Sequence, residues 1–163
     1  MTILPGMELW RLGEGWGAGA LGTLALTAWE PVRGALLGHE PVYSVGQLAK
    51  RGARQWWGVR LSDKAANRWG LLARWMYGPS LGALYAWARP VLPRRLRWSG
   101  VLLGCAVGAF EALSFAPLRV TASPRTWSRG EHALLAFQVL LFGFVTEAVL
   151  ARTEKRNARP RRR

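Results

Sequence analysis

The stretch from His132 to Ala151 reads HALLAFQVLLFGFVTEAVLA, and Glu147 is its only charged residue. An α-helix needs about 20 mostly apolar residues to cross the hydrocarbon core of a bilayer. A soluble helical bundle would have to bury this stretch on nearly all sides. The stretch therefore predicts a transmembrane helix, and the rest of the sequence is interpreted from it.

Three more segments upstream have comparable length and few charges. They are Trp16 to Leu37, Trp69 to Ala88 and Ser99 to Ala116, the last followed directly by Pro117. The mean hydropathy of the whole chain is only +0.04 because the charges collect in the connections and at the C-terminus. We expect an all-α fold, an integral membrane bundle of four transmembrane helices in one domain over residues 1–156. A disordered basic tail should follow at residues 157–163.

Prolines and charges interrupt two of the four segments. Pro31 lacks a backbone donor and clashes with the preceding turn, so it should kink the first helix or end its lipid-facing part. The second segment carries Arg74 near its start and Gly78-Pro79 near its middle, and it is the weakest match to a span.

The connection from Gly38 to Arg68 is long enough to hold structure of its own. Its apolar residues recur at about helical spacing with basic residues between them, which predicts an amphipathic helix in the membrane interface. Ser62-Asp63 follows, and serine is a preferred N-cap residue. We expect the second long helix to begin there, with the turn Lys64 to Arg68 protruding from the membrane.

The net charge of +14 would suggest nucleic-acid binding in a soluble protein. Much of this charge flanks apolar segments, so we expect anionic lipid headgroups as the partner and no nucleic acid. Arginines crowd the connection Arg89 to Trp98 and the tail after Ala151, and four spans put both on one side. The positive-inside rule makes that side cytoplasmic and places both termini there, although the first connection is basic too.

The sequence contains no recognisable catalytic or metal-binding motif. It has two histidines and one cysteine, Asp63 is its only aspartate, and zinc-protease, CxxC, nucleophile-elbow and phosphate-loop patterns are missing. We therefore expect no enzyme activity, no metal and no cofactor. The lone Cys105 lies in an apolar segment, where a thiol behaves as a small hydrophobic group.

Small residues recur at four-residue spacing in three of the predicted spans. Such a glycine groove lets two helix backbones approach closely, which is a main route to helix packing in lipid. We expect packing within one chain, with a homodimer or another membrane protein as the alternative occupant. The glycines are Gly15 and Gly19 in the first span, Gly78 and Gly82 in the second, and Gly100, Gly104 and Gly108 in the third.

Charged residues inside the predicted spans are the best candidates for a site, because an ionisable group in hydrocarbon usually faces a partner or a water-filled cavity. At about 1.5 Å rise per residue, Glu30, Arg74 and Glu111 lie at similar depth in the outer half of the membrane. We expect them to form one buried polar cluster, with Glu147 separate near the opposite face. Structural ion pairing, or extension of Arg33 and Arg74 to the headgroups, is the alternative.

Several short motifs carry a family resemblance. Gly15-Trp16-Gly17-Ala18-Gly19 opens the first span, Trp29-Glu30-Pro31 closes its apolar part, the stretch Trp75 to Tyr85 (WMYGPSLGALY) lies in the second, and His132 enters the last. With these motifs the chain resembles the YagU-like family of small bacterial inner-membrane proteins. The resemblance implies four spans and a bacterial inner membrane. It implies no activity and transfers no catalytic residue.

Two classes of function fit this sequence. The first is a non-enzymatic membrane protein that scaffolds partners or takes part in the response of the membrane to stress. The second is a small transporter or an ion- or proton-conducting protein that uses Glu30, Arg74 and Glu111. In that hypothesis two glutamates and one arginine leave one carboxylate free to bind a proton or cation.

Overall fold

The computed structural model describes residues 9–39, 41, 43–93, 100–115, 117–121 and 123–157. This part of the chain is all-helical and contains no strand, which confirms the all-α fold. Four long helices are joined by one shorter helix and two single turns, η1 (Arg89–Val91) and η2 (Pro124–Thr126). The helices are α1 (Leu9–Leu37), α2 (Val45–Trp57), α3 (Asp63–Ala88), α5 (Gly100–Phe115) and α6 (Arg129–Asn157).

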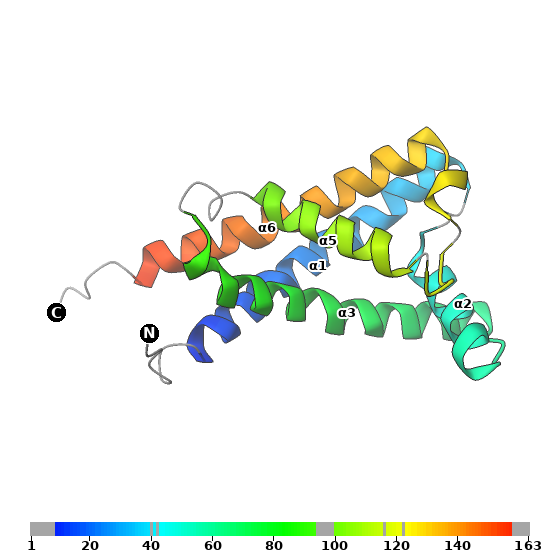
Figure 1. The fold of residues 1–163 in the computed structure, drawn as a ribbon, viewed down its shortest axis with the longest axis horizontal. Helices are drawn as coiled ribbons and strands as arrows, with labels where there is room; N and C mark the ends of the chain where they lie inside the picture. The colour runs from blue at the N-terminus through cyan, green and yellow to red at the C-terminus, as the bar shows by residue number, and fades with distance from the viewer. Residues whose placement is uncertain are drawn as a thin grey trace.

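The long helices lie side by side in an elongated bundle (Figure 1). α1 packs against both α3 and α6, α5 packs against α6, and α2 packs against the first half of α3. α2 lies at the same end of the bundle as the end of α1 and the start of α6, and the start of α1 and the end of α6 lie at the other end (Figure 1). α1 is therefore the central helix.

Each predicted span coincides with one long helix. Residues 16–37 fall within α1, residues 69–88 within α3 and residues 132–151 within α6, and α5 covers 99–116 except its two terminal residues. Asn157, which we expected in the disordered tail, is the last residue of α6, and its side-chain amide donates to Glu14 at 2.6 Å. The rest of the predicted tail lies outside the described residues.

Pro31, which we expected to kink the first helix or to end its lipid-facing part, lies inside α1, and α1 continues to Leu37. A side-chain contact stabilises the turn of α1 that follows Pro31, because Arg33 is buried and donates to Gln138 on α6. A proline removes one backbone hydrogen bond, and contacts of this kind offset that loss. Pro79 likewise lies inside α3, where it is fully buried against α1.

The predicted helix in the first connection exists as α2. Ser44 is its N-cap and accepts from the backbone N–H of Gln47, and Gly58 ends it in the left-handed conformation with φ 68°. Ser62 caps α3 as expected and accepts from the backbone N–H of Ala65. Lys50 of α2 forms an ion pair with Asp63 at the start of α3, which joins the two helices as a hairpin.

The seven predicted packing glycines all lie at contacts between helices of the same chain. A Cβ added at Gly19 would lie 2.6 Å from the carbonyl oxygen of Gly78, and one added at Gly104 would lie 2.7 Å from that of Val139. Gly15 and Gly82 face each other across the same α1–α3 contact. Gly100 and Gly108 meet α6 alongside Gly104. The groove is thus occupied within the chain.

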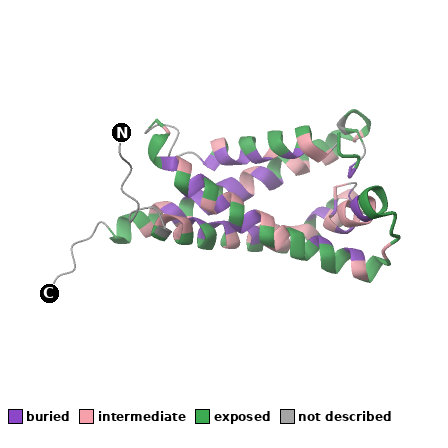
Figure 2. Ribbon diagram, turned by 60° about the horizontal axis from the view of Figure 1, so that its bottom comes forward, coloured by how far each residue is buried: buried purple, intermediate pink, exposed green. Residues whose placement is uncertain are grey.

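The bundle buries several polar side chains beside its apolar core and exposes many apolar side chains on its outer surface. Near the middle of α1, Thr23 is fully buried while its neighbour Leu24 is 51% exposed. Near the middle of α6, Thr146 is fully buried while Phe144 is 52% exposed. Figure 2 shows buried residues along the facing sides of the helices and exposed residues on their outer sides.

One of the described helices, α6, is long and apolar enough to cross a membrane by length and hydropathy. α5 is also apolar but has only 16 residues. The core helix of a soluble protein can pass the same test, so α6 alone is weak evidence for a membrane.

Candidate functional site

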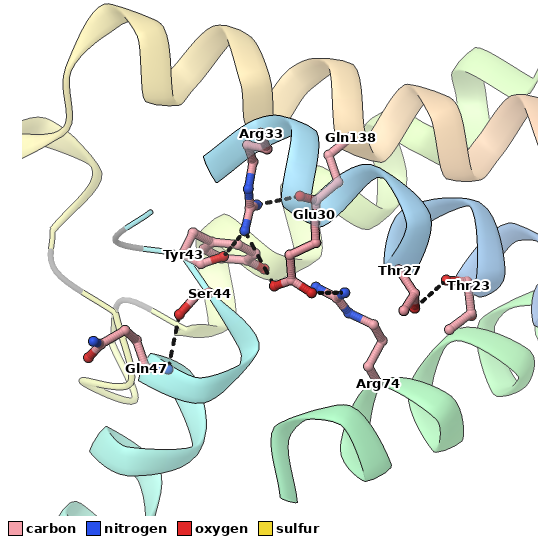
Figure 3. Close-up of polar contacts among 9 residues, drawn as sticks. All are labelled: Thr23, Thr27, Glu30, Arg33, Tyr43, Ser44, Gln47, Arg74 and Gln138. Carbon is pink, nitrogen blue, oxygen red and sulfur yellow. Dashed lines mark hydrogen bonds and ion pairs between the residues drawn. The ribbon is translucent and has the colours of Figure 1, made fainter. Parts of the chain in front are cut away.

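Glu30 and Arg74 meet between α1 and α3. Nη1 of Arg74 donates to Oε2 of Glu30 at 2.7 Å, and the side chains are 9% and 26% exposed, arginine first (Figure 3). The residues are 44 positions apart in the sequence. They meet because α1 and α3 pack closely at glycines. The two helices are therefore near enough for one glutamate and one arginine side chain to reach each other.

Arg33 is a second cation in this cluster, and of the two alternatives given for it, ion pairing and extension to the headgroups, its contacts match ion pairing. Its side chain is 3% exposed and its Nη2 lies 3.7 Å from Oε1 of Glu30. Arg33 also donates to Oε1 of Gln138 on α6 and to the backbone carbonyl of Tyr43 (Figure 3). One turn of α1 thus connects α3, α6 and the segment before α2.

Glu111 lies on the face of α5 that points into the bundle, and it is 8% exposed. It is near enough to Arg74, Arg33 and Tyr43 to interact electrostatically with each of them. The Tyr43 hydroxyl is close enough to interact with it as a hydrogen-bond donor. Among the described residues, however, no group meets full hydrogen-bond geometry at its buried Oε2. Glu30 and Arg74 therefore form a direct pair, whereas Glu111 stands beside that pair.

The charges around Glu30 change the argument for a spare carboxylate. Two glutamates with only Arg74 would leave one negative charge unbalanced. Arg33 adds a second positive charge, so Glu30, Glu111, Arg33 and Arg74 are neutral together when all four are ionised. Excess negative charge is thus no longer a reason for cation binding.

Two tyrosines complete the surroundings of Glu111. The Tyr43 ring stacks on Phe115 with centroids 6.0 Å apart, and the Tyr77 ring stacks on Phe110 at 6.2 Å. Both hydroxyl oxygens are buried, and among the residues that the structure describes neither has a partner at full hydrogen-bond geometry. Burial raises the pKa of Tyr43 well above its usual value, and the neighbouring Glu111 carboxylate raises it further.

A small pocket opens next to the cluster at the end of the bundle that carries α2. Arg33, Leu37, Tyr43, Trp127 and Glu131 are among its lining residues. Tyr43 therefore borders both this pocket and the surroundings of Glu111, with its ring packed edge-on against Trp127 at 5.7 Å.

A second buried ion-pair cluster lies near the opposite end of the bundle. Nη2 of Arg89 donates to Oε1 of Glu147 at 2.6 Å, and Oη of Tyr85 donates to the other carboxylate oxygen at 2.8 Å. Nη1 of Arg89 also lies 2.6 Å from Oε1 of Glu154. Glu147 is thus apart from Glu30, Arg74 and Glu111, and Arg89 ties the end of α3 to α6.

Sequence reasoning missed several of these side chains for identifiable reasons. Arg89 stands at the start of an arginine-rich connection, where solvent exposure is the ordinary expectation, yet it is 3% exposed. Arg33 follows Pro31 near the end of the predicted first span, where a long side chain can ordinarily reach the headgroups. The polar residues Gln138 and Thr146 inside an otherwise apolar span were the available signal that the α6 face turned inward is polar.

The cluster contains acids, cations and phenols in contact, which is suited to holding helices together and to exchanging protons. No group of three or more histidine, cysteine, aspartate or glutamate side chains that could hold a metal ion occurs in the described ranges. Comparison of the chain with family profiles, with curated proteins and with solved structures found no match.

Proposed function

We propose that the protein is a non-enzymatic, multi-pass membrane protein whose helices α1, α3, α5 and α6 cross the membrane as a bundle. In this proposal the bundle scaffolds partners in the membrane or takes part in its response to stress. The resemblance to the YagU-like family supports a bacterial inner membrane as the location.

The observation that carries the proposal is the apolar exterior at the middle of the bundle. Leu24, Met76 and Phe144 lie near the midpoints of α1, α3 and α6 and are 51%, 67% and 52% exposed. Soluble monomers rarely expose apolar patches that continue across several elements. A lipid environment accounts for this exterior, because hydrocarbon solvates it without cost.

The interior supports a structural role. Glu30 is held by two arginines at one end, and Glu147 is held by Arg89 and Tyr85 at the other. Between these layers the backbones of α1 and α3 meet at Gly19 and Gly78. Two closed polar layers with tight packing between them favour a rigid bundle over an open passage.

Cysteine accessibility tests the membrane location. In a Cys105→Ala background, single cysteines at Leu24, Met76 and Phe144 are compared with one at Gln55, which is exposed on α2. In native membranes a water-soluble maleimide should modify Gln55→Cys and spare the other three, since lipid covers them. After denaturation in detergent all four should react.

The opposite result has a clear meaning. Comparable reaction at all four positions in untreated membranes would show that water surrounds the middle of the bundle. The proposal of a membrane-spanning bundle would then be wrong. Release of the protein from membranes by alkaline carbonate would lead to the same conclusion.

Proton or ion conduction is the second candidate, and Glu111 favours it. A buried carboxylate that no cation contacts directly is the kind of group found along proton pathways in membranes. Liposomes with a trapped pH dye separate the candidates. A scaffold leaves an imposed pH gradient as stable as in empty liposomes, whereas a conductor dissipates it and loses this activity on Glu111→Gln.

A further inference from the structure

Three buried oxygen atoms around Glu111 have no hydrogen-bond partner in the described structure. They are Oε2 of Glu111 on α5, Oη of Tyr77 on α3 and Oη of Tyr43 before α2. Buried polar groups are almost always hydrogen-bonded, because an unsatisfied one costs about 1 to 3 kcal/mol. Three such atoms from three separate elements at one place point to a bound species that satisfies them together.

The three side chains are neighbours. Glu111 interacts electrostatically with both tyrosines, and the tyrosines interact with each other. Their rings are stacked against Phe110 and Phe115 of the helix that carries Glu111, so both phenols are held beside that carboxylate. Rings fixed by stacking cannot rotate freely to find other partners.

The arginines nearby are engaged elsewhere. Arg74 donates to Glu30, and Arg33 donates to Gln138 and to the carbonyl of Tyr43. Glu111 can therefore gain or lose its charge without breaking any of these contacts. A buried carboxylate whose Oε2 has no fully formed hydrogen bond favours the neutral, protonated form over the ionised one.

We propose that Glu111, Tyr43 and Tyr77 form a site that binds a proton together with one bridging water molecule. The water accepts from both tyrosine hydroxyls and donates to the carboxylate, which gives it the about three hydrogen bonds that buried waters usually make. When a hydronium ion arrives, one of its O–H bonds breaks, the proton bonds to Oε2 of Glu111, and the hydronium becomes a neutral water molecule. Tyr43 also borders the small pocket at the α2 end of the bundle, which brings that pocket next to the site.

This site deepens the conduction candidate, because a proton that binds must enter and leave. Arg33 and Arg74 oppose protonation through their positive charge, and Glu30 favours it. Burial among the aromatic rings is the additional contribution that favours the neutral acid. Binding at Glu111 alone does not require that the proton crosses the bundle.

Infrared difference spectroscopy of the full chain in lipid nanodiscs tests the site. The carbonyl band of a protonated carboxylic acid is followed through a pH titration in the native protein, in Glu111→Gln and in Glu154→Gln. Glutamine keeps the size and hydrogen-bonding shape of glutamate but binds no proton at this pH. The band should titrate in the native protein, vanish in Glu111→Gln and persist in Glu154→Gln, which removes a half-exposed acid at the other end of the bundle.

Tyr43→Phe and Tyr77→Phe test the water bridge with the acid in place. Each removes one hydroxyl and keeps the ring stack, so the Glu111 band should shift in frequency without being lost. A band unchanged by Glu111→Gln, or no titrating carboxyl band at all in folded native protein, would overturn the proposal. Bands unaffected by both phenylalanine variants would overturn the bridge. These results do not depend on the maleimide pattern, so failure here is distinguishable from failure of the membrane proposal.

Discussion

Arg74 on α3 donates to Glu30 on α1 at 2.7 Å, and this ion pair links the two helices directly. Arg74 makes no such contact with Glu111 on α5. Arg33 shares the same carboxylate from one turn further along α1. The cluster therefore behaves as a network in which Glu30 is the common acceptor.

We predict that a second substitution, at the partner of Arg74, restores part of the stability that is lost when Arg74 is replaced. Arg74→Met should lower the free energy of unfolding by about 1 to 3 kcal/mol, because Glu30 keeps only the longer contact with Arg33. Adding Glu30→Gln should restore part of that loss, since the unpaired charge is removed. Thermal unfolding in detergent measures both. Rescue by Glu111→Gln in place of Glu30→Gln would show that Arg74 acts mainly on Glu111.

The two acids that contact Arg89 should differ in importance. Removing the partner of a buried charge costs about 3 to 5 kcal/mol, so Glu147→Gln should destabilise the bundle strongly. Glu154 touches the same arginine but is 45% exposed, and Glu154→Gln should cost less than about 1 kcal/mol. Guanidinium or detergent unfolding compares them. Equal losses from the two variants would show that burial does not decide the strength of these pairs.

Two glycines in one helix should respond in opposite ways to alanine. A Cβ at Gly19 would meet the backbone of α3 within 3.0 Å, whereas one at Gly17 meets nothing within 4 Å. Gly19→Ala should therefore destabilise by about 1 to 3 kcal/mol through forced separation of α1 and α3. Gly17→Ala should be neutral or stabilise by up to about 1 kcal/mol, because alanine is the better helix former. Loss of stability only at Gly17 would contradict the α1–α3 contact.

The sequence predicts the positions of the helices more clearly than the polar contacts between them. Long apolar segments bounded by Pro117 and Ser62 predict the helical regions because hydrophobicity and capping act locally. Depth along each helix brought Glu30 and Arg74 to the same level, since rise per residue is constant. Depth alone does not say which way a side chain points around its helix. The burial of Arg33 and Arg89 depends on how helices cross, and no short-range pattern encodes that.

The last prediction concerns the orientation in the membrane. In the sequence, arginine-rich segments follow α3 and α6, whose ends lie at the same end of the bundle as the start of α1. Arg89 at that end is paired with Glu147 and Glu154. The C-terminal arginines remain, and the positive-inside rule still favours a cytoplasmic location for this end. In a Cys105→Ala background, a cysteine at Gln55 on α2 should react with an impermeant maleimide added to intact cells. One at Arg156, which is exposed on the last turn of α6, should react only after permeabilisation. Both positions should react in denaturing detergent, which controls for access to the thiol. Reaction of Arg156→Cys alone in intact cells would reverse the orientation, and reaction of both would show that the basic residues around α2 balance those of the C-terminal end.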